Sequence, residues 1–277
     1  MEIKTALKEA SALLSWVENP QKEAALLLCE HLHVERTWLL LHEREELKDI
    51  EGYFSLVERR KAHEPLEYIL GKASFYGRDF LVDAGVLVPR PETELLVDAV
   101  VALLGEYPSP RILEVGVGSG VISVMLALLF PSARIVATDI SPKALENAQK
   151  NARLFGVDGR ICFVETSYME GVAGAFDVLV SNPPYIARDV VLETHVLKEP
   201  HAALFGGEKG DEMLKELLKR TQALPIAHVA CEMGWDQRAS MQEYLEALGA
   251  KEIVFYQDLA GLDRGFCARM KEYGWDV

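Results

Sequence analysis

The chain of 277 residues is long enough for one large domain or two smaller ones, and its hydrophobic content of 49% is that of an ordinary globular protein. A formal net charge of −14, with no run of basic residues, argues against a protein that grips nucleic acid, because a duplex presents a dense row of phosphates. The longest apolar run, residues 124–131, is well short of the ~20 residues that a membrane-spanning helix needs, so we expect no membrane association.

The first twenty residues carry acids and lysines at helical spacing instead of a basic start followed by a solid apolar core. They do not resemble a secretory signal, and we expect a cytoplasmic protein. Four cysteines lie far apart with no C-x-x-C pair, which favours buried thiols in a reducing compartment over disulfides or zinc. His31 and His33 are two apart, so on a helix they point to different faces, and we expect no metal site.

Residues 1–73 show the pattern of several short helices. Apolar residues recur at helical spacing in residues 3–17, Asn19-Pro20 interrupts the pattern, and further short helical stretches follow with turn residues between them. The pattern predicts a small N-terminal helical bundle. Such a bundle is either a self-contained packing unit or a docking domain for a protein partner, and the residues alone do not choose between these roles.

Residues 74–89 come next and have the alternation of a β-hairpin, with apolar side chains spaced around Gly77 and Gly85. We expect this hairpin to connect two domains. Pro91 then stands at a good first-turn position, and Glu92 and Glu94 suit the positive end of a helix dipole. The sequence therefore predicts a helix that runs from this point to Leu104, with residues 89–94 acting as its cap.

Residues 90–277 alternate between short apolar runs and helical stretches. Strands are expected at residues 111–117, 133–139, 161–166, 176–181 and 227–233. Apolar runs of four to six residues, flanked by helices, are typical of a parallel sheet that is covered on both faces. Residues 252–257 and 265–270 follow each other without an evident helix and suggest an antiparallel edge. The prediction is a doubly wound, Rossmann-like α/β domain.

The first of these strands ends in a glycine-rich loop with glycines at 116, 118 and 120. Glycine at the junction of a strand and a helix lets a ligand approach the backbone closely, because no Cβ is in the way. The third glycine of a dinucleotide fingerprint is replaced by Val121, so a nicotinamide or flavin site is disfavoured, and no G-K-[ST] triplet indicates a triphosphate site.

Asp139 ends the second strand, 23 residues after Gly116. A carboxylate at this position can accept hydrogen bonds from both hydroxyls of a ribose, which indicates a nucleoside without phosphates. The alternative is local: Asp139 precedes Ser141-Pro142, a good N-cap and first turn, and could serve only the start of that helix. The glycines before it favour the ribose.

The fourth strand ends in the sequence Asn182-Pro183-Pro184-Tyr185. Proline donates no backbone hydrogen bond, so the carbonyls around Pro183 and Pro184 are free to accept one, and Asn182 adds a side-chain acceptor. Two adjacent acceptors suit an NH₂ group on a planar carbon, either a side-chain amide or an exocyclic amine. Tyr185 offers a flat face to that plane.

Together, the stretches ILEVGVGSG, TDISP and FDVLVSNPPYI resemble the class I S-adenosylmethionine-dependent methyltransferases whose Asn-Pro-Pro-Tyr motif acts on planar NH₂ groups. Three further parts are similar to the peptide chain release factor glutamine methyltransferases: residues 73–97, residues 199–210, and the pair CEMGWDQ and DLAGLDR. The helical N-terminal domain followed by a hairpin is also similar to that family. The resemblance covers nearly the whole chain and is strongest from Phe75 to Gly210.

The resemblance implies S-adenosyl-L-methionine as cofactor, S-adenosyl-L-homocysteine as product, and the glutamine of the Gly-Gly-Gln loop of class I release factors as substrate. The implied cofactor residues are Gly116, Val117, Gly118, Ser119, Gly120, Asp139 and Asn182. Many relatives carry an acidic or aromatic residue near the adenine, where this chain has Thr166, Ser167 and Tyr168, and Ser167 is the first candidate. The implied substrate residues are Asn182, Pro183, Pro184 and Tyr185, with Asn182, Pro183 and Tyr185 as the catalytic ones.

Three alternatives remain open at this level. Methylation of a glutamine in a ribosomal protein uses the same chemistry, and adenine-N6 methylation of nucleic acid uses the same motif on a flipped base. The acidic charge and the absence of an obvious basic recognition segment argue against nucleic acid. The third alternative, a non-catalytic module that binds the cofactor and docks a partner, is disfavoured by the intact substrate motif.

Overall fold

The computed structural model describes residues 1–105 and 107–270, and its contacts divide the chain into two units. The first unit contains Met1–Lys72 and Leu192–Lys198, and the second contains Ala73–Val191 and Glu199–Val277. The sequence pattern contained no sign that seven residues beyond position 191 group with the helical unit. The predicted connector at residues 74–89 groups with the second unit.

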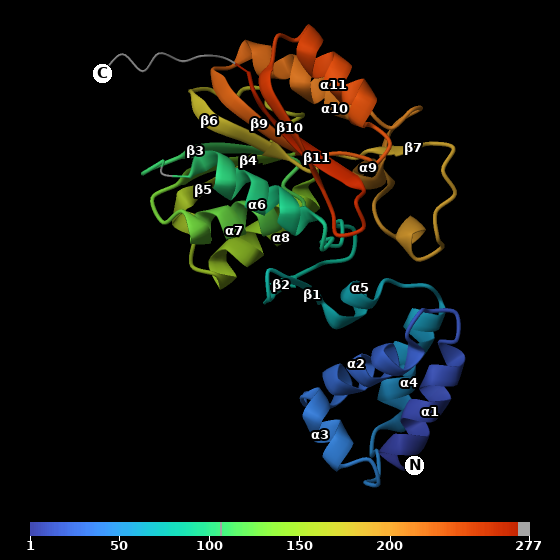
Figure 1. Cartoon of the computed structure of the whole chain (residues 1–277). Coiled ribbons are helices and arrows are strands. Elements are labelled where there is room, and N and C mark those ends of the chain that lie inside the picture. The colour runs from blue at the N-terminus through green and yellow to red at the C-terminus, as the bar shows by residue number, and fades with distance from the viewer. Residues whose placement is uncertain (106, 271–277) are drawn as a thin grey trace. The chain divides into compact units, whose positions relative to one another are not determined.

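The first unit is built from five short helices around one apolar core (Figure 1). They are α1 (Ile3–Leu13), α2 (Pro20–Leu32), α3 (Arg36–Leu41), α4 (Ile50–Lys61) and α5 (Leu66–Leu70). Pro20 opens α2 and the Asn19 side chain accepts a hydrogen bond from the backbone of Lys22, so the predicted break is a helix start. The buried Tyr53 hydroxyl donates to the carbonyl of Ala24 at 3.0 Å and joins α4 to α2.

The segment Leu192–Lys198 is part of this unit and ends in a 3₁₀ turn, Val196–Lys198. The centre of the His195 ring lies 5.8 Å from the centre of the Trp16 ring, and the centre of the His63 ring lies 4.2 Å from it. Contacts between rings at these distances are favourable. Trp16, in the turn after α1, therefore contacts both the segment, through His195, and the chain between α4 and α5, through His63.

The second unit has a seven-stranded sheet in the order β10-β11-β9-β6-β3-β4-β5. Its strands are β3 (Arg111–Val115), β4 (Arg134–Asp139), β5 (Ile161–Glu165), β6 (Phe176–Ser181), β9 (Ile226–Glu232), β10 (Lys251–Gln257) and β11 (Asp263–Arg269). The first five are parallel to one another, whereas β11 runs antiparallel to β9 and β10 antiparallel to β11. The predicted doubly wound sheet with an antiparallel edge is confirmed.

Helices cover both faces of this sheet and enclose two apolar cores. On one face lie α6 (Thr93–Leu104), α7 (Val121–Leu129) and α8 (Pro142–Leu154); on the other lie α10 (Glu212–Arg220) and α11 (Arg238–Ala247) (Figure 1). The strand β6 is buried at all six positions, and its two polar side chains bind the neighbouring β3: Asp177 Oδ2 accepts from Arg111 N and the Ser181 hydroxyl donates to Val115 O, both at 2.7 Å. Burial of both faces fixes where each strand ends, and therefore where the polar residues after it emerge.

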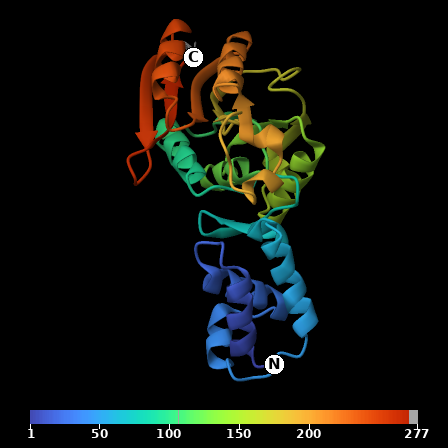
Figure 2. The same cartoon turned by 90° about the vertical axis from the view of Figure 1, so that its right-hand side faces the viewer.

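The hairpin is shorter than the sequence predicted. It consists of β1 (Lys72–Phe75) and β2 (Arg78–Leu81), joined at Gly77, and is the narrow teal ribbon in Figure 2. Val86 and Val88 are buried as expected but lie outside any strand. Two buried asparagines of α8 hold the end of β2: Asn151 accepts from Leu81 N at 2.8 Å and donates to Leu81 O at 2.9 Å, and Asn147 donates to the same carbonyl at 3.0 Å.

The predicted cap of α6 is also corrected. The helix begins at Thr93, two residues later than Pro91, and its N-cap residue Glu92 makes no side-chain cap bond. Glu94 instead accepts a hydrogen bond from Tyr76 N of the hairpin at 2.7 Å. Residues 89–94 therefore link the hairpin to the start of α6, and they bring Thr93 to the end of the sheet where the substrate motif lies.

Several smaller elements were not predicted. Two short strands, β7 (Ile186–Ala187) and β8 (Phe205–Gly207), pair in parallel directly after the substrate motif, and a short helix, α9 (His201–Leu204), precedes β8. Short 3₁₀ turns occur at Asp158–Arg160 and Thr221–Ala223. Cys231 is buried and unpaired as expected, but Cys162 is exposed. No helix within the described residues is long and apolar enough to cross a membrane.

Candidate functional site

A cavity of about 270 Å³ lies at the carboxyl ends of β3, β4 and β6. The chain order within the sheet reverses between β3 and β6, and clefts at such reversals are the usual ligand sites of doubly wound sheets. Its walls come from residues at or after the ends of these strands and of β5. Further lining residues are Gly85–Leu87, Pro200, Ala202 and Ala203, and two residues of α10. All of these residues belong to the second unit.

The glycine-rich loop forms one wall of the cavity. Gly116 and Gly118 have positive φ angles of 78° and 53°, a conformation that disfavours other residues, and both line the cavity. A Cβ added to either glycine would meet no protein atom within 4 Å, so their missing side chains leave room for a ligand.

The other three residues of the predicted loop do not line the cavity. Val117 and Ser119 are buried, and the carbonyl of Ser119 accepts a hydrogen bond from Asn151 at 2.8 Å. At Gly120 a Cβ would lie 2.9 Å from Cα of Ala148, so this glycine allows α7 and α8 to approach each other. The structure thus separates a ligand-facing part of the loop from a part that packs inside the protein.

Asp139 lines the cavity at the end of β4 and is fixed from two sides. Its Oδ2 accepts a hydrogen bond from Gly118 N at 3.0 Å, and its Oδ1 accepts one from Ser141 N at 2.9 Å. Ser141 is the N-cap of α8, so the local and the ligand-binding interpretations hold together. Burial raises the pKa of Asp139, although these backbone bonds lower it. Each carboxylate oxygen keeps an acceptor site for a further donor.

Thr166, Ser167 and Tyr168 all line the same cavity. The Thr166 hydroxyl donates to the carbonyl of Glu170 at 3.0 Å, and the Arg220 guanidinium lies 4.6 Å from the centre of the Tyr168 ring. Ser167 is the one of the three whose side chain has no partner within the described part of the chain.

Asn182 follows β6 and lines the cavity together with Pro183 and Pro184. The Asn182 side-chain nitrogen Nδ2 donates to the Thr93 hydroxyl oxygen at 3.0 Å, which leaves Oδ1 as the free end of the amide. No hydrogen bond to the Pro183 carbonyl occurs among the residues that the structure describes. Two acceptors are therefore available next to each other at the rim.

Tyr185 does not line the cavity, in contrast to the other three residues of its motif. Its hydroxyl donates to Oε1 of Glu232 at 3.0 Å, and its carbonyl accepts from the Gln237 side chain at 2.9 Å. Burial and the neighbouring Glu232 raise the pKa of the phenol, so it stays protonated and can donate. The structure places the phenol against the protein interior.

Glu232, at the end of β9, is the buried acceptor of this network. Its second oxygen, Oε2, accepts from the Thr93 hydroxyl at 2.8 Å, and the residue is 1% exposed. Burial raises its pKa to about 7, although the hydrogen bonds from Thr93 and Tyr185 lower it. One carboxyl group therefore holds both Thr93 and Tyr185.

Sequence reasoning assigned no role to Thr93, Glu232 or Gln237. Each lay in a stretch that was noticed only for its resemblance or for helix capping. The same holds for Gly206 and Gly210, where an added Cβ would collide with the carbonyl oxygens of Pro184 and Tyr185 respectively. The close backbone approach at these glycines packs residues 205–210 against the substrate motif.

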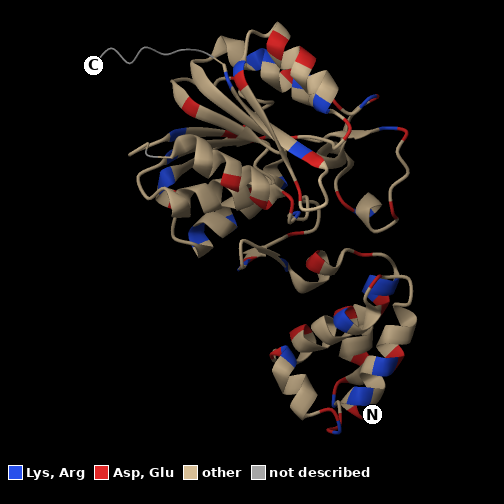
Figure 3. Ribbon diagram, viewed as in Figure 1, with Lys and Arg blue, Asp and Glu red and all other residues tan. Residues whose placement is uncertain are grey.

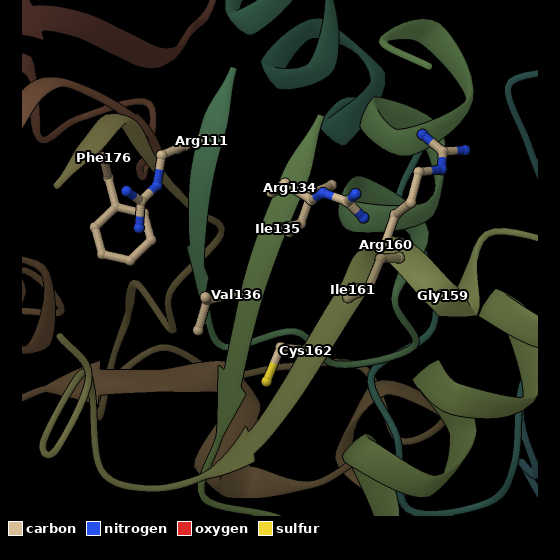
Figure 4. Close-up of a pocket in the computed structure, with 9 residues that line it drawn as sticks. All are labelled: Arg111, Arg134, Ile135, Val136, Gly159, Arg160, Ile161, Cys162 and Phe176. Carbon is tan, nitrogen blue, oxygen red and sulfur yellow. The ribbon is translucent and has the colours of Figure 1, made fainter. Parts of the chain in front are cut away.

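A second cavity of about 250 Å³ lies at the opposite end of the strands (Figure 4). Its charged residues are Arg111, Arg134 and Arg160, and no carboxylate lines it. Figure 4 shows the Arg111 guanidinium beside the Phe176 ring, 5.7 Å from its centre. Without a carboxylate that could bind ribose hydroxyls, this cavity does not suit a nucleoside, so the cavity at Asp139 is the candidate cofactor site.

Two family models match the chain. The model described as the PrmC N-terminal domain matches residues 5–71, and the model described as the methyltransferase small domain matches residues 91–205. The first covers the helices of the first unit, and the second covers the strands β3 to β6 with the substrate motif.

Solved structures share the fold at low sequence identity. The N-terminal domain of human METTL16 in complex with SAH superposes with a TM-score of 0.54 at 16% identity, over 84% of this chain and 87% of that one. A ribosomal protein L11 methylase from Lactobacillus delbrueckii subsp. bulgaricus gives 0.50 at 21% identity, over 68% and 82%. These likenesses establish the methyltransferase fold.

Relatives of similar length match from end to end. The release factor glutamine methyltransferase of Moorella thermoacetica is 37% identical over 98% of this chain and 100% of its own length, and that of Deinococcus radiodurans is 36% identical over 97% and 99%. The protein of the same name from Chlorobaculum tepidum is 38% identical over 90% of each chain. This similarity over nearly the whole length shows that the chain belongs to the release factor glutamine methyltransferases, a family of S-adenosylmethionine-dependent enzymes.

Proposed function

We propose that this chain transfers a methyl group from S-adenosylmethionine to the side-chain nitrogen N5 of the glutamine in the Gly-Gly-Gln loop of class I peptide chain release factors. The observation that carries the proposal is the orientation of Asn182. Its Nδ2 donates inward to Thr93, so its Oδ1 stands free beside the Pro183 carbonyl. A cytoplasmic location is part of the same proposal, because translation takes place there.

The cavity fits the cofactor. Gly116 and Gly118 leave space where side chains would stand, and Asp139 has acceptor sites for a ribose. Ser167 is the candidate for a contact with adenine. When bound there, S-adenosylmethionine supplies a methyl group on a positively charged sulfur. The alanines of α9 and Leu217 of α10 add apolar surface to the same cavity.

The protein's part in the reaction is to orient a weak nucleophile. The nitrogen of a glutamine amide is a poor nucleophile because its lone pair is delocalised into the carbonyl. Asn182 Oδ1 and the Pro183 carbonyl accept hydrogen bonds from its two N–H groups. These bonds fix the direction of the nitrogen and stabilise the positive charge that develops on it. No general base is needed, since the methylated, protonated amide loses a proton readily to water.

The role expected for Tyr185 changes in detail. Because its hydroxyl is bound to Glu232 and its carbonyl to Gln237, the residue is held rigidly behind the rim. We assign it to fixing the backbone that carries the Pro183 and Pro184 carbonyls. Contact between its ring and the amide plane of the substrate remains a prediction.

Nucleic acid is the weaker alternative substrate. Acidic and basic residues are interspersed along the helices of both units in Figure 3, in a chain of net charge −14. A protein that holds a phosphate backbone usually concentrates basic residues on one face. Glutamine methylation of a ribosomal protein needs the same rim and is tested alongside.

The test is to incubate the pure protein with labelled cofactor and, separately, with a release factor, its Gln→Ala loop variant, a ribosomal-protein fraction and a DNA duplex. Mass spectrometry then locates the added methyl group. We expect one methyl on the loop glutamine and none on the Gln→Ala variant. Label in the ribosomal proteins or the DNA alone would contradict the proposal, and no transfer to any of them would indicate a binding module.

A further inference from the structure

The hydrogen bonds behind the substrate motif have a fixed direction. Thr93 has one hydroxyl proton, and that proton is donated to Glu232 Oε2 at 2.8 Å. Its oxygen is then free to accept, and it accepts from Asn182 Nδ2 at 3.0 Å. Since Thr93 has no second proton, it cannot at the same time donate to an oxygen placed where Nδ2 lies. When Glu232 is ionised, the Asn182 amide therefore has one satisfied orientation.

We infer that Glu232 and Thr93 are a positioning pair that holds the Asn182 amide with its oxygen toward the substrate. This inference rests on the proposed function of Asn182 as an acceptor. An asparagine turned by 180° would present an NH₂ group to the substrate NH₂, and two donors facing each other repel. The pair thus determines whether residue 182 attracts or rejects the glutamine.

The fold places the pair where this is possible. Ser181 of β6 is the register partner of Cys231 of β9, so Asn182 and Glu232 are the next residues of two adjacent parallel strands. Thr93 is the first residue of α6 and is 3% exposed, while Glu232 is 1% exposed. Water has little access to replace either hydrogen bond, and a buried donor left without a partner costs free energy.

Glu232 also fixes the second half of the motif. Its other oxygen accepts from the Tyr185 hydroxyl at 3.0 Å. In its ionised form, the Glu232 carboxylate accepts from both neighbours and donates to neither. In Glu232→Gln one of the two oxygens becomes an NH₂ donor, so either Thr93 or Tyr185 loses its acceptor.

The first experiment compares Thr93→Val, Thr93→Ser and Glu232→Gln in the full chain. We expect Thr93→Val and Glu232→Gln to lower kcat on the release factor by roughly 10- to 100-fold, with the cofactor Kd within about threefold of wild type. Thr93→Ser keeps the hydroxyl and is expected to recover most of the turnover lost in Thr93→Val. The matched control is Thr221→Val, which removes a hydroxyl that is equally buried and bonded to Leu218 O, outside the cavity.

A double-mutant cycle separates positioning from general destabilisation. If Thr93 acts through Asn182, Thr93→Val has little further effect on kcat once Asn182 is alanine. Equal losses in both backgrounds would overturn the inference, as would wild-type turnover in Thr93→Val.

A measurement without substrate keeps this inference distinct from the proposed function. The Asn182 side-chain NH₂ signal is assigned by its loss in Asn182→Asp, and its hydrogen exchange is followed by NMR. We expect slow exchange in wild type and in Thr93→Ser, and faster exchange in Thr93→Val and Glu232→Gln. Slow exchange with no methyl transfer to the release factor would count against the proposed function alone. Unchanged exchange in Thr93→Val would count against the positioning pair alone.

Discussion

Asn182 carries the largest share of the proposed chemistry in one side chain. Asn182 Oδ1 is a side-chain acceptor of the substrate motif at the cavity, and it has no hydrogen-bond partner among the residues described. We predict that Asn182→Ala lowers turnover by roughly 10²–10³-fold, by analogy with the loss of one oriented polar partner. Single-turnover kinetics with labelled cofactor measure the rate.

Cofactor binding provides the control for that variant. Gly116, Gly118 and Asp139 are unchanged in Asn182→Ala, so calorimetry should give a cofactor Kd within a few-fold of wild type. Near-normal turnover would reject Asn182 as the acceptor, and a large loss of cofactor affinity would assign it to the cofactor instead.

Glu114 couples stability to pH. It is fully buried on β3, and its Oε1 has no hydrogen-bond partner among the described residues, while Oε2 accepts from Ser123. Burial raises its pKa from 4.5 to about 8, although the Ser123 bonds lower it. The folded protein thus binds this proton more tightly than the unfolded chain, so the free energy of unfolding falls as pH rises from about 4.5 through 8.

Glu114→Gln removes that titration, because an amide does not ionise. We predict that the stability of the variant relative to wild type increases between pH 5 and pH 8. Urea unfolding at four pH values in this range measures the difference, in which titrations common to both proteins cancel. Parallel stability curves for the two proteins would show that Glu114 does not titrate as described.

At the scale of elements, two of the three glycines in the loop between β3 and α7 have different roles. Gly118→Ala would place a methyl group in the cavity, and Gly120→Ala would place one against the backbone of Ala148 in α8. Both positions have positive φ, so each substitution also adds about 1–2 kcal/mol of backbone strain. We predict that Gly118→Ala weakens cofactor binding at least tenfold with modest destabilisation, whereas Gly120→Ala mainly lowers Tm.

The matched control for both glycines is Gly156→Ala. Gly156 has a φ of 68°, and an added Cβ there meets nothing within 4 Å, outside the cavity. It reports the strain alone and should leave cofactor binding unchanged. Equal effects of Gly118→Ala and Gly156→Ala on cofactor affinity would remove Gly118 from the site.

The strands were predictable from the sequence because both faces of a parallel sheet are buried, and short apolar runs that are flanked by helical stretches are typical of such a sheet. The hairpin was predicted too long because Val86 and Val88 are buried by irregular backbone, which produces the same alternation as a strand. Asp139 was found because it ends a strand, and Asn182 because it directly follows one. Thr93 and Glu232 were missed because their contact joins residues 139 positions apart, and no local pattern encodes it.

At the scale of the whole molecule, the helical unit is expected to contribute to recognition of the protein substrate. On α3, Leu40 and Leu41 are 67% and 79% exposed, an unusual position for two adjacent large apolar side chains. We predict that Leu40→Ser combined with Leu41→Ser raises KM for an intact release factor at least fivefold. Methylation of a short Gly-Gly-Gln peptide should not change, since the cavity at Asp139 and Asn182 lies wholly in the second unit.

Val254→Ser is the control for this pair, because Val254 is 62% exposed on β10 of the second unit. It should leave KM for the release factor unchanged. If the control and the double variant behave alike, or if peptide methylation falls with the double variant, α3 is not part of the docking surface.

The chain passes between the units after Lys72, after Val191 and after Lys198. The helical unit is therefore a composite of two pieces of sequence, although one family model covers nearly all of its first piece. A chimaera that exchanges only the first 72 residues with a relative would place foreign helices against the native Leu192–Lys198, including the ring contact of His195 with residue 16. To replace the helical unit with that of a relative, both pieces have to be exchanged together. The second piece, Leu192–Lys198, then has to be joined at both of its ends to the sequence of the second unit.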